Sequence, residues 1–177
     1  MIISVEELKS YITTSESDSV LEARLSALEI LIRKYTNNNF QNRNIRFRVS
    51  ASSEYGLLKA SPFLHVGDTV QLTDSALNSG IYTIESIDMQ NGRMWLNSAL
   101  YDESDILLTK VEYPLDVKMG VVNMMKWDSD NRDKVGIQSE TISRHSVTYF
   151  NMDKENSKIG YPASLTGFLL PYMKARF

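Results

Sequence analysis

NIRFRVS, residues 44–50, is the stretch at which the sequence changes from a helical period to a twofold one. Its apolar residues Ile45, Phe47 and Val49 alternate with polar ones, which is the pattern of a strand with one buried face. Four further segments have strand composition, and turn-forming Asn and Gly separate some of them: HVGDTVQLTDS (65–75), GIYTIESID (80–88), GRMWLNSAL (92–100) and DILLTKVEY (105–113). We predict a small antiparallel barrel or sandwich over residues 43–112.

Helical patterns precede this β-rich stretch. Ser4 and Glu7 form a capping box at the start of a short helix over residues 5–12. A second helix is predicted to begin near Ser17 and to end in the asparagines at 37–39, because Asn favours a left-handed helix cap. One face of this second helix is apolar, with residues spaced three or four apart: Leu21, Leu25, Leu28, Ile32 and Tyr35.

Helical chemistry returns after the β-rich stretch, where Pro114 suits a first helical turn and residues 115–127 are apolar around most of the helix. A charged loop is predicted over residues 128–134 and a β-hairpin over residues 137–150. The fold class is therefore α+β, a small helical bundle with a C-terminal β-hairpin and an inserted β-rich module. Its two domains are a helical one, residues 1–42 and 113–177, and the insert, residues 43–112.

Composition narrows the classes of function. The 177 residues carry a formal net charge of −3, so no overall basic field attracts nucleic acid. The chain has no cysteine, which excludes disulfides, thiolate nucleophiles and cysteine zinc sites. We see neither a secretion signal nor an apolar run of about 18 residues, so we expect a protein that folds in the cytoplasm and does not enter a membrane.

Residues that could carry catalysis are sparse. His65 and His145, the only imidazoles, fall in different predicted modules and in no known metal-ligand spacing. The segment DSDNRD at 128–133 begins like a calcium loop, but Arg132 stands where a ligand is needed. The acidic runs at 6–7 and 102–105 could also suggest paired carboxylates or a divalent cation site, and a hydrolase with a carboxylate-bound metal is a rival function that we do not favour. We therefore predict no catalytic residue, no metal site and no cofactor.

Arginines on the first strand offer one binding alternative. Arg43, Arg46 and Arg48, with Phe47 between them, are placed as in small barrels that bind single-stranded nucleic acid. Arginine on the solvent side of a strand is the commoner explanation of this pattern. A nucleic-acid-binding module therefore stays as the alternative function of the insert.

The last 18 residues, GYPASLTGFLLPYMKARF at 160–177, are dense in large apolar side chains beyond a polar spacer. Each of these side chains would gain about 1.5–3 kcal/mol from full burial, whereas so short a segment is marginal as an isolated helix. It packs either on its own domain or on a partner. We predict docking on a partner, with deletion of residues 160–177 leaving a folded monomer, through Leu165, Phe168, Leu169, Leu170, Tyr172, Met173 and Phe177.

Two helices carry residues that suit either a core or a subunit interface. The apolar seam of the second helix has further apolar residues beside it, and methionine fills irregular cores and adaptable interfaces alike. For a subunit interface the candidates are Leu21, Leu25, Leu28, Ile32, Met119, Met124 and Met125.

The order of these elements resembles the head–tail connector (adaptor) proteins of tailed bacteriophages. The resemblance lies in the opening ISVEELKSYI, in the second helix ending LIRKYTNNNF, in the hairpin GIQSETISRHSVTYF and in the ending LLPY at 169–172. It covers residues 1–42 and 113–177, and the insert departs from it. In the hairpin the matching residues are Gly136, Ser139, Glu140, Ile142, Ser146, Val147, Thr148 and Tyr149.

The resemblance implies a virion protein of the head–tail interface that is structural and not an enzyme. It implies a twelve-subunit ring of identical copies whose C-terminal segment docks on the portal protein. The hairpin residues Ile137, Ile142, Val147 and Tyr149, or nearby loops, would meet the next connector or tail component. DNA would pass through the channel without sequence-specific binding. Another virion ring protein, such as a tail terminator, is a second alternative.

Overall fold

The computed structural model describes residues 1–131, 139–142, 145–148 and 157–175. The chain divides into two compact units. One consists of Met1 and Asn39–Glu112, and the other of Ile2–Asn38 and Tyr113–Phe177. The first boundary lies four residues before the one expected at residue 43. We call these the β unit and the helical unit.

The helical unit begins with two helices, and one end of each follows the capping rules, whereas the Ser17 side chain makes no capping hydrogen bond at the start of the second. Helix α1 (Val5–Tyr11) starts at Ser4, whose hydroxyl accepts a hydrogen bond from the Glu7 backbone N–H at 3.1 Å. Helix α2 (Asp18–Thr36) ends at Asn37, which adopts the left-handed conformation with a φ of 51°. The sequence predicted both of these ends.

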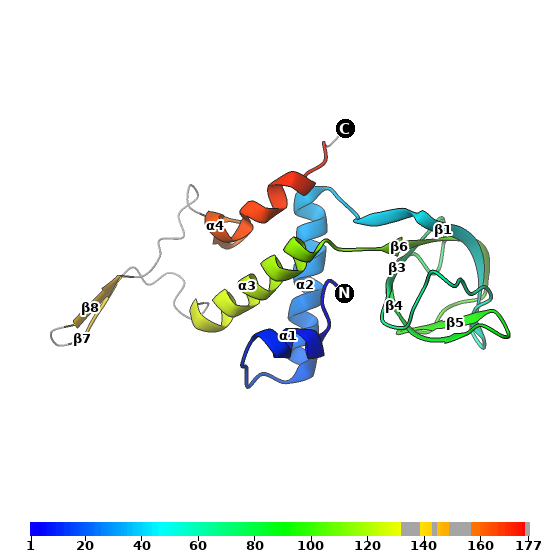
Figure 1. The fold of residues 1–177 in the computed structure, drawn as a ribbon, viewed down its shortest axis with the longest axis horizontal. Helices are drawn as coiled ribbons and strands as arrows, with labels where there is room; N and C mark the ends of the chain where they lie inside the picture. Colours follow the sequence, from blue (N-terminus) through cyan, green and yellow to red (C-terminus); the bar gives the residue numbers. More distant parts are fainter. Residues whose placement is uncertain (132–138, 143–144, 149–156, 176–177) are drawn as a thin grey trace. The chain divides into compact units, whose positions relative to one another are not determined.

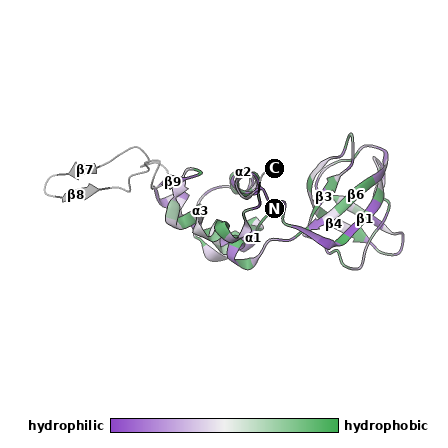
Figure 2. Ribbon diagram, turned by 90° about the horizontal axis from the view of Figure 1, so that it is seen from above, coloured by the Kyte–Doolittle hydropathy of each residue, from purple (hydrophilic) through white to green (hydrophobic). Residues whose placement is uncertain are grey.

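Helix α3 (Leu115–Asn131) is four residues longer than predicted. The residues expected to open a charged loop, from Asp128 onwards, form its last turn. In Figure 2 α2 is seen end-on while α3 runs across the view, so the two helices cross instead of lying side by side. The predicted small helical bundle is therefore not supported.

The remaining elements of the helical unit are short. Strands β7 (Ser139–Ile142) and β8 (His145–Thr148) pair antiparallel as a hairpin, inside the range where one was predicted. A second antiparallel pair, β9 (Ser157–Lys158) and β10 (Tyr161–Pro162), follows. The chain then forms α4 (Ala163–Thr166) and the 3₁₀ helix η2 (Gly167–Tyr172). Figure 1 shows α4 in orange and η2 in red; α4 contacts α3, and η2 contacts both α2 and α3.

The β unit is a six-stranded antiparallel sheet that closes on itself (Figure 1). Its order is β1-β2-β5-β4-β3-β6, and β6 pairs in turn with β1. Together the unit and the helices make a mixed α+β protein. The strands are β1 (Gln41–Ser52), β2 (Gly56–Leu57), β3 (Thr69–Thr73), β4 (Gly80–Asp88), β5 (Arg93–Leu96) and β6 (Glu103–Val111).

Alternating side chains fill the interior of this closed sheet. On β1, Val49 is buried and Phe47 is packed against the core, whereas Arg46 and Arg48 are exposed, as the twofold period predicted. Figure 2 shows the same alternation of hydrophobic and hydrophilic residues along the strands. The core of the unit consists of Val49, Ala51, Leu57, Leu64, Val70, Leu72, Ile84, Met94, Leu96, Leu100, Ile106 and Leu108.

One glycine of α3 shows how closely the C-terminal segment packs on the helical unit. A Cβ atom added to Gly120 would lie 2.2–2.5 Å from ring atoms of Phe168, which is nearer than real contacts allow. We predict that Gly120→Ala lowers the free energy of unfolding. Overpacking costs about 1–3 kcal/mol, which exceeds the gain of about 1 kcal/mol from alanine in a helix interior. Urea unfolding measures the difference.

Two further variants make this prediction specific. Gly167→Ala is the matched control, because a Cβ atom there meets nothing within 4 Å. Adding Phe168→Leu to the Gly120→Ala variant should recover part of the lost stability, since the smaller side chain relieves the clash. Equal stability of Gly120→Ala and wild type would mean that Phe168 does not lie against α3.

Candidate functional site

The C-terminal segment, in which the sequence placed the docking site, is bound to its own helical unit. The Tyr172 hydroxyl donates to Asp116 of α3, 2.8 Å from one carboxylate oxygen and 2.9 Å from the other. The backbone N–H of Lys174 donates to the Thr36 carbonyl at 2.8 Å. Asn38 donates to the Tyr172 carbonyl at 3.1 Å. The segment therefore contacts both α3 and the C-terminal end of α2.

These bonds satisfy groups that a helix end leaves open. The last carbonyls of an α-helix have no partner within the helix, and Thr36 is the last residue of α2. The Lys174 N–H supplies a partner for one of them, and the Asn37 side chain donates to the Ala175 carbonyl at 2.8 Å. The segment thus acts as part of the cap of α2.

Burial divides the seven predicted docking residues. Leu169 is completely buried within the helical unit, so its assignment to a docking surface was wrong. Leu169 is buried against α2 and α3 of its own chain, where we expected it to be buried against a partner. Leu165, Phe168 and Tyr172 are half-buried, Leu170 and Met173 are 55% and 47% exposed, and Phe177 lies outside the described residues.

The deletion expectation changes for the same reason. Tyr161 is 4% exposed and Leu169 is buried, so residues 160–177 contribute to the core of the helical unit. Removing them would uncover apolar surface on α2 and α3. The expectation that the shortened chain keeps a folded monomer therefore does not fit the structure.

Most of the predicted subunit-interface residues are also buried in the chain itself. Helix α2 directs its apolar seam inward, as does α3 with two of its methionines. The sequence pattern fits a core and an interface equally, and here the core takes these side chains. The interface assignment was wrong for Leu21, Leu25, Leu28, Ile32, Met124 and Met125, all at most 5% exposed, whereas Met119 is 42% exposed.

Four large apolar side chains are exposed on α3 and the C-terminal segment. Leu115 and Met119 are 77% and 42% exposed and lie one helical turn apart. Leu170 and Met173 belong to the segment that contacts α3 through Tyr172 and Phe168. We call these four residues the tail patch. Leu170 and Met173 come from the predicted docking set and Met119 from the predicted subunit interface, whereas Leu115 was not predicted for either.

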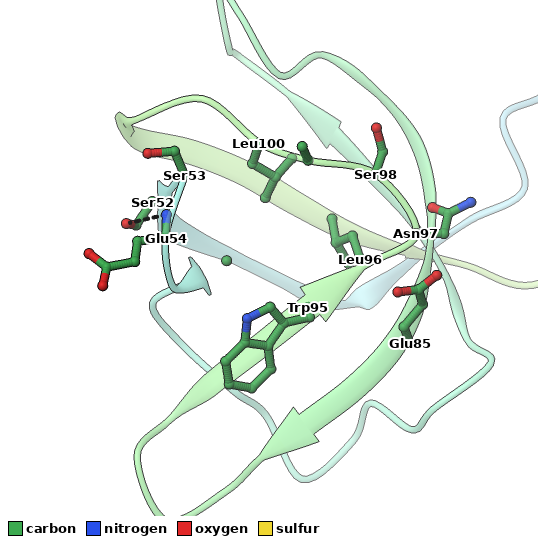
Figure 3. A pocket seen from close by; sticks show the side chains of 11 residues that line it. Ser52, Ser53, Glu54, Glu85, Trp95, Leu96, Asn97, Ser98 and Leu100 are labelled. Carbon is green, nitrogen blue, oxygen red and sulfur yellow. Dashed lines mark hydrogen bonds between the residues drawn. The ribbon is translucent and has the colours of Figure 1, made fainter.

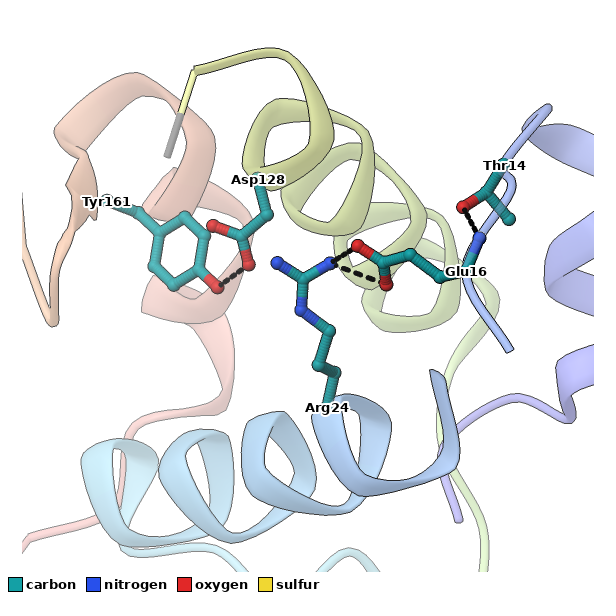
Figure 4. Close-up of polar contacts among 5 residues, drawn as sticks. All are labelled: Thr14, Glu16, Arg24, Asp128 and Tyr161. Atoms are coloured by element: carbon teal, nitrogen blue, oxygen red, sulfur yellow. Dashed lines mark hydrogen bonds and ion pairs between the residues drawn. The ribbon is translucent and has the colours of Figure 1, made fainter. Parts of the chain in front are cut away.

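A buried hydrogen bond joins the start of the C-terminal segment to α3. The Tyr161 hydroxyl donates to the Asp128 carboxylate at 2.7 Å, and both residues are buried (Figure 4). Arg24 of α2 points between Asp128 and Glu16, and its guanidinium is 2.6 Å and 2.8 Å from the two Glu16 carboxylate oxygens. Asp128 was predicted to be solvated in a loop. The sequence did not show that α3 continues through it.

A second buried polar group joins α2 to the start of α3. The Tyr113 hydroxyl donates to Glu29 at 2.7 Å and lies 3.4 Å from a guanidinium nitrogen of Arg33. Burial raises the pKa of Tyr113, and the negative charge of Glu29 raises it further. Tyr113 therefore stays protonated and acts as the hydrogen-bond donor. This group holds structure and has no open face for a substrate.

The acidic run at 102–105 organises turns of the β unit. Asp102 accepts hydrogen bonds from the backbone N–H of Ser53 at 2.6 Å and from its hydroxyl at 3.0 Å. Glu103 accepts from the Ser75 hydroxyl, from the Ala76 N–H at 2.7 Å and from the Asn78 side chain at 2.8 Å. Within the described ranges, no three His, Asp or Glu residues lie where they could hold a metal ion.

Of the three β1 arginines that were candidates for nucleic-acid binding, Arg48 is already bonded to other residues of the β unit. Arg48 donates to Asp74 at 2.8 Å and to the Asp105 carbonyl at 2.6 Å. The ammonium of Lys59 lies 5.0 Å from the centre of the Phe47 ring, so this ring is covered by a cation. Arg43 and Arg46 are exposed.

The other candidate residues belong to different elements of the chain. His65 is exposed in a loop of the β unit, 3.7 Å from Asp68, and His145 belongs to β8. Ile142 and Val147 belong to β7 and β8, whereas Ile137 and Tyr149 lie outside the described residues. Among the helices of the described ranges, none is long and apolar enough to cross a membrane.

Comparison of the sequence with models of protein families finds no match, and comparison with curated proteins finds none either. The resemblance to phage connectors therefore rests on the motifs quoted above.

The bonds to Glu103 predict a pH dependence of stability. The Ser75 hydroxyl foremost, and then the other donors, lower the pKa of Glu103 from its usual 4.5 to about 2. The folded chain thus favours the ionised form. Its contribution is complete above pH 4.5 and is lost as the pH falls from 4.5 through about 2. We expect the difference in unfolding free energy between wild type and Glu103→Gln, measured in urea, to shrink over this range. A difference independent of pH would contradict it.

Proposed function

We propose that the protein is a structural adaptor of a tailed-phage particle, a head–tail connector that docks on the portal protein through the tail patch. The observation that carries the proposal is the exposure of Leu115, Met119, Leu170 and Met173 on two elements that contact each other. Contiguous exposed apolar surface marks interaction sites, and we infer that these four side chains form such a surface. The motifs shared with phage connectors supply the class of partner.

The energetics of the tail patch suit docking. Covering a leucine or methionine side chain fully is worth about 1.5–3 kcal/mol. The residues around Leu170 and Met173 are already held by the bonds of Tyr172 and Lys174. A partner would therefore bind a preorganised surface and would not have to order a flexible tail. This replaces the expectation of a segment that becomes ordered only on the portal.

The proposal includes a ring of identical copies, twelve by the connector resemblance. A ring needs two different faces on each subunit, because each contact joins one face to the opposite face of a neighbour. The buried seam of α2 is not available for this contact. Exposed apolar residues of α1 and α2 are the candidates that replace it: Tyr11 (52%), Val20 (46%) and Ile30 (51%).

In this role the chain carries out no reaction. The virion would hold it at the head–tail interface, with the hairpin or nearby loops at the next connector or tail component. DNA would pass without sequence-specific contacts. A tail terminator or another virion ring protein is the nearest alternative, and cross-linking to portal or to tail tube distinguishes them.

Nucleic-acid binding by the β unit is the less favoured alternative. Single-stranded nucleic acid needs an open aromatic face beside several cations. Lys59 covers the Phe47 ring, and Arg48 is paired with Asp74. Arg43 and Arg46 remain exposed but without that ring as a stacking surface.

Two charge substitutions in the tail patch test the proposal. Leu170→Glu and Met173→Glu should leave the thermal unfolding temperature close to that of wild type, since both side chains are about half exposed. Both should weaken binding to purified portal rings by about tenfold or more, because docking would bury an unpaired carboxylate. Mass photometry of the protein alone and with portal measures the binding and the number of copies.

Leu58→Glu is the matched control, because Leu58 is 47% exposed but belongs to the β unit. It should bind portal as wild type does. Unchanged binding by both tail-patch variants, or equal loss with Leu58→Glu, would refute docking through the tail patch. If wild type bound the tail tube but not the portal, the protein would be a tail component such as a tail terminator and not a portal-binding connector.

A further inference from the structure

The β unit has a hollow of about 350 Å³ that the connector proposal does not use. The turn after β1, the middle of β4, strand β5 and the loop after β5 surround it (Figure 3). Its most distinctive lining groups are the indole of Trp95 and the carboxylates of Glu54 and Glu85. Figure 3 shows Glu54 and Glu85 on opposite sides of the hollow, with Trp95 between them.

The position of Trp95 depends on a close approach of two strands. Gly56 of β2 has a φ of 68°, a conformation that favours glycine. A Cβ atom there would lie 2.4 Å from the Met94 carbonyl oxygen and 3.2 Å from an indole carbon of Trp95. Only glycine lets β2 come this near β5. The indole of Trp95 therefore lies next to the backbone of β2 and is partly exposed.

Glu54 is presented by an ordered turn. The Ser52 hydroxyl accepts hydrogen bonds from the backbone N–H groups of Glu54 at 3.3 Å and Tyr55 at 3.4 Å. Asp102 binds the backbone N–H of Ser53 at 2.6 Å. These bonds fix the backbone of the turn from which the exposed Glu54 side chain extends.

Glu85 is presented by an irregularity in the sheet. Strands β4 and β5 pair Ile84 with Leu96 and Ser86 with Trp95, which leaves Glu85 as the extra residue of a bulge. A bulge redirects the side chain of its extra residue. Here the redirected carboxylate lines the hollow beside the indole.

The charge of the hollow has one sign. Glu54 and Glu85 line it, and no lysine or arginine does. Within the part of the chain that the structure describes, neither carboxylate has a hydrogen-bond or ion-pair partner. Two carboxylates beside an indole attract an organic cation, because the face of an indole is negative and tryptophan is the best cation–π partner.

We propose that this hollow binds an alkylammonium group, from a lysine side chain or from a small amine. The indole of Trp95 would contact the alkyl groups next to the charged nitrogen, and Glu54 and Glu85 would balance the charge. A sugar also uses aromatic and carboxylate groups, but it has no charge to match two unpaired carboxylates. The site belongs to the β unit and is independent of docking through the tail patch.

Fluorescence of Trp95 tests this directly. The chain has two tryptophans, so Trp127→Phe leaves Trp95 as the single indole reporter. We expect saturable changes on titration with choline or with N-acetyl-lysine methylamide, the two probes that distinguish a small amine from a lysine side chain. The uncharged analogue 3,3-dimethyl-1-butanol should bind at least about fivefold more weakly than choline.

Carboxylate variants test the charge. Glu54→Gln and Glu85→Gln should each weaken binding of the better cation by about two- to fivefold, and added salt should weaken it too. The matched control is Glu22→Gln, which makes the same charge change on an exposed residue of α2. It should have no effect.

The outcomes separate clearly. A preference for choline or for the lysine probe identifies the source of the ammonium group, and either one supports the site. No saturable signal with either cation overturns the proposal, as does equal binding of the uncharged analogue. Equal loss with Glu22→Gln overturns it as well. Saturable binding of glucose without binding of the cations would make the hollow a sugar site.

Discussion

The contact of the C-terminal segment with α2 and α3 is the interaction on which the helical unit depends. Helices α2 and α3 cross, and the 3₁₀ helix η2 contacts both of them. Phe168 lies against Gly120, Leu169 is buried, and Lys174 caps Thr36. The end of the chain thereby holds together two helices that are separated in sequence by the whole β unit. A partner can use only the side chains that this packing leaves exposed.

Local chemistry allowed much of the fold to be predicted. Ser4 caps α1, Asn37 ends α2 in the left-handed conformation, and the alternation on β1 separates buried from exposed residues. Each of these features depends only on residues that are close together in the chain, so it can be predicted from the sequence. The mixed α+β class and the hairpin of β7 and β8 followed from the same kind of pattern.

What could not be predicted depends on residues far apart in the chain. Leu25, Ile32 and Met124 have the pattern of an interface as much as that of a core, and only the packed structure assigns them to the core. Asp128 has the composition of a loop, but the Tyr161 hydroxyl lies beside it in the fold. The Glu85 bulge is a mismatch between two strands, which neither strand shows by itself.

The two ends of the β unit meet each other. Gln41 of β1 is paired with Val111 of β6, and the Glu112 N–H donates to the Phe40 carbonyl at 2.9 Å. The chain thus leaves and re-enters the helical unit through a stem of two adjacent strands, as a tight hairpin would. The entropy cost of bringing the two ends of this stem together grows only slowly with the length of chain between them. Evolution could therefore lengthen, shorten or replace the chain between residues 41 and 111 while the helical unit kept its own architecture.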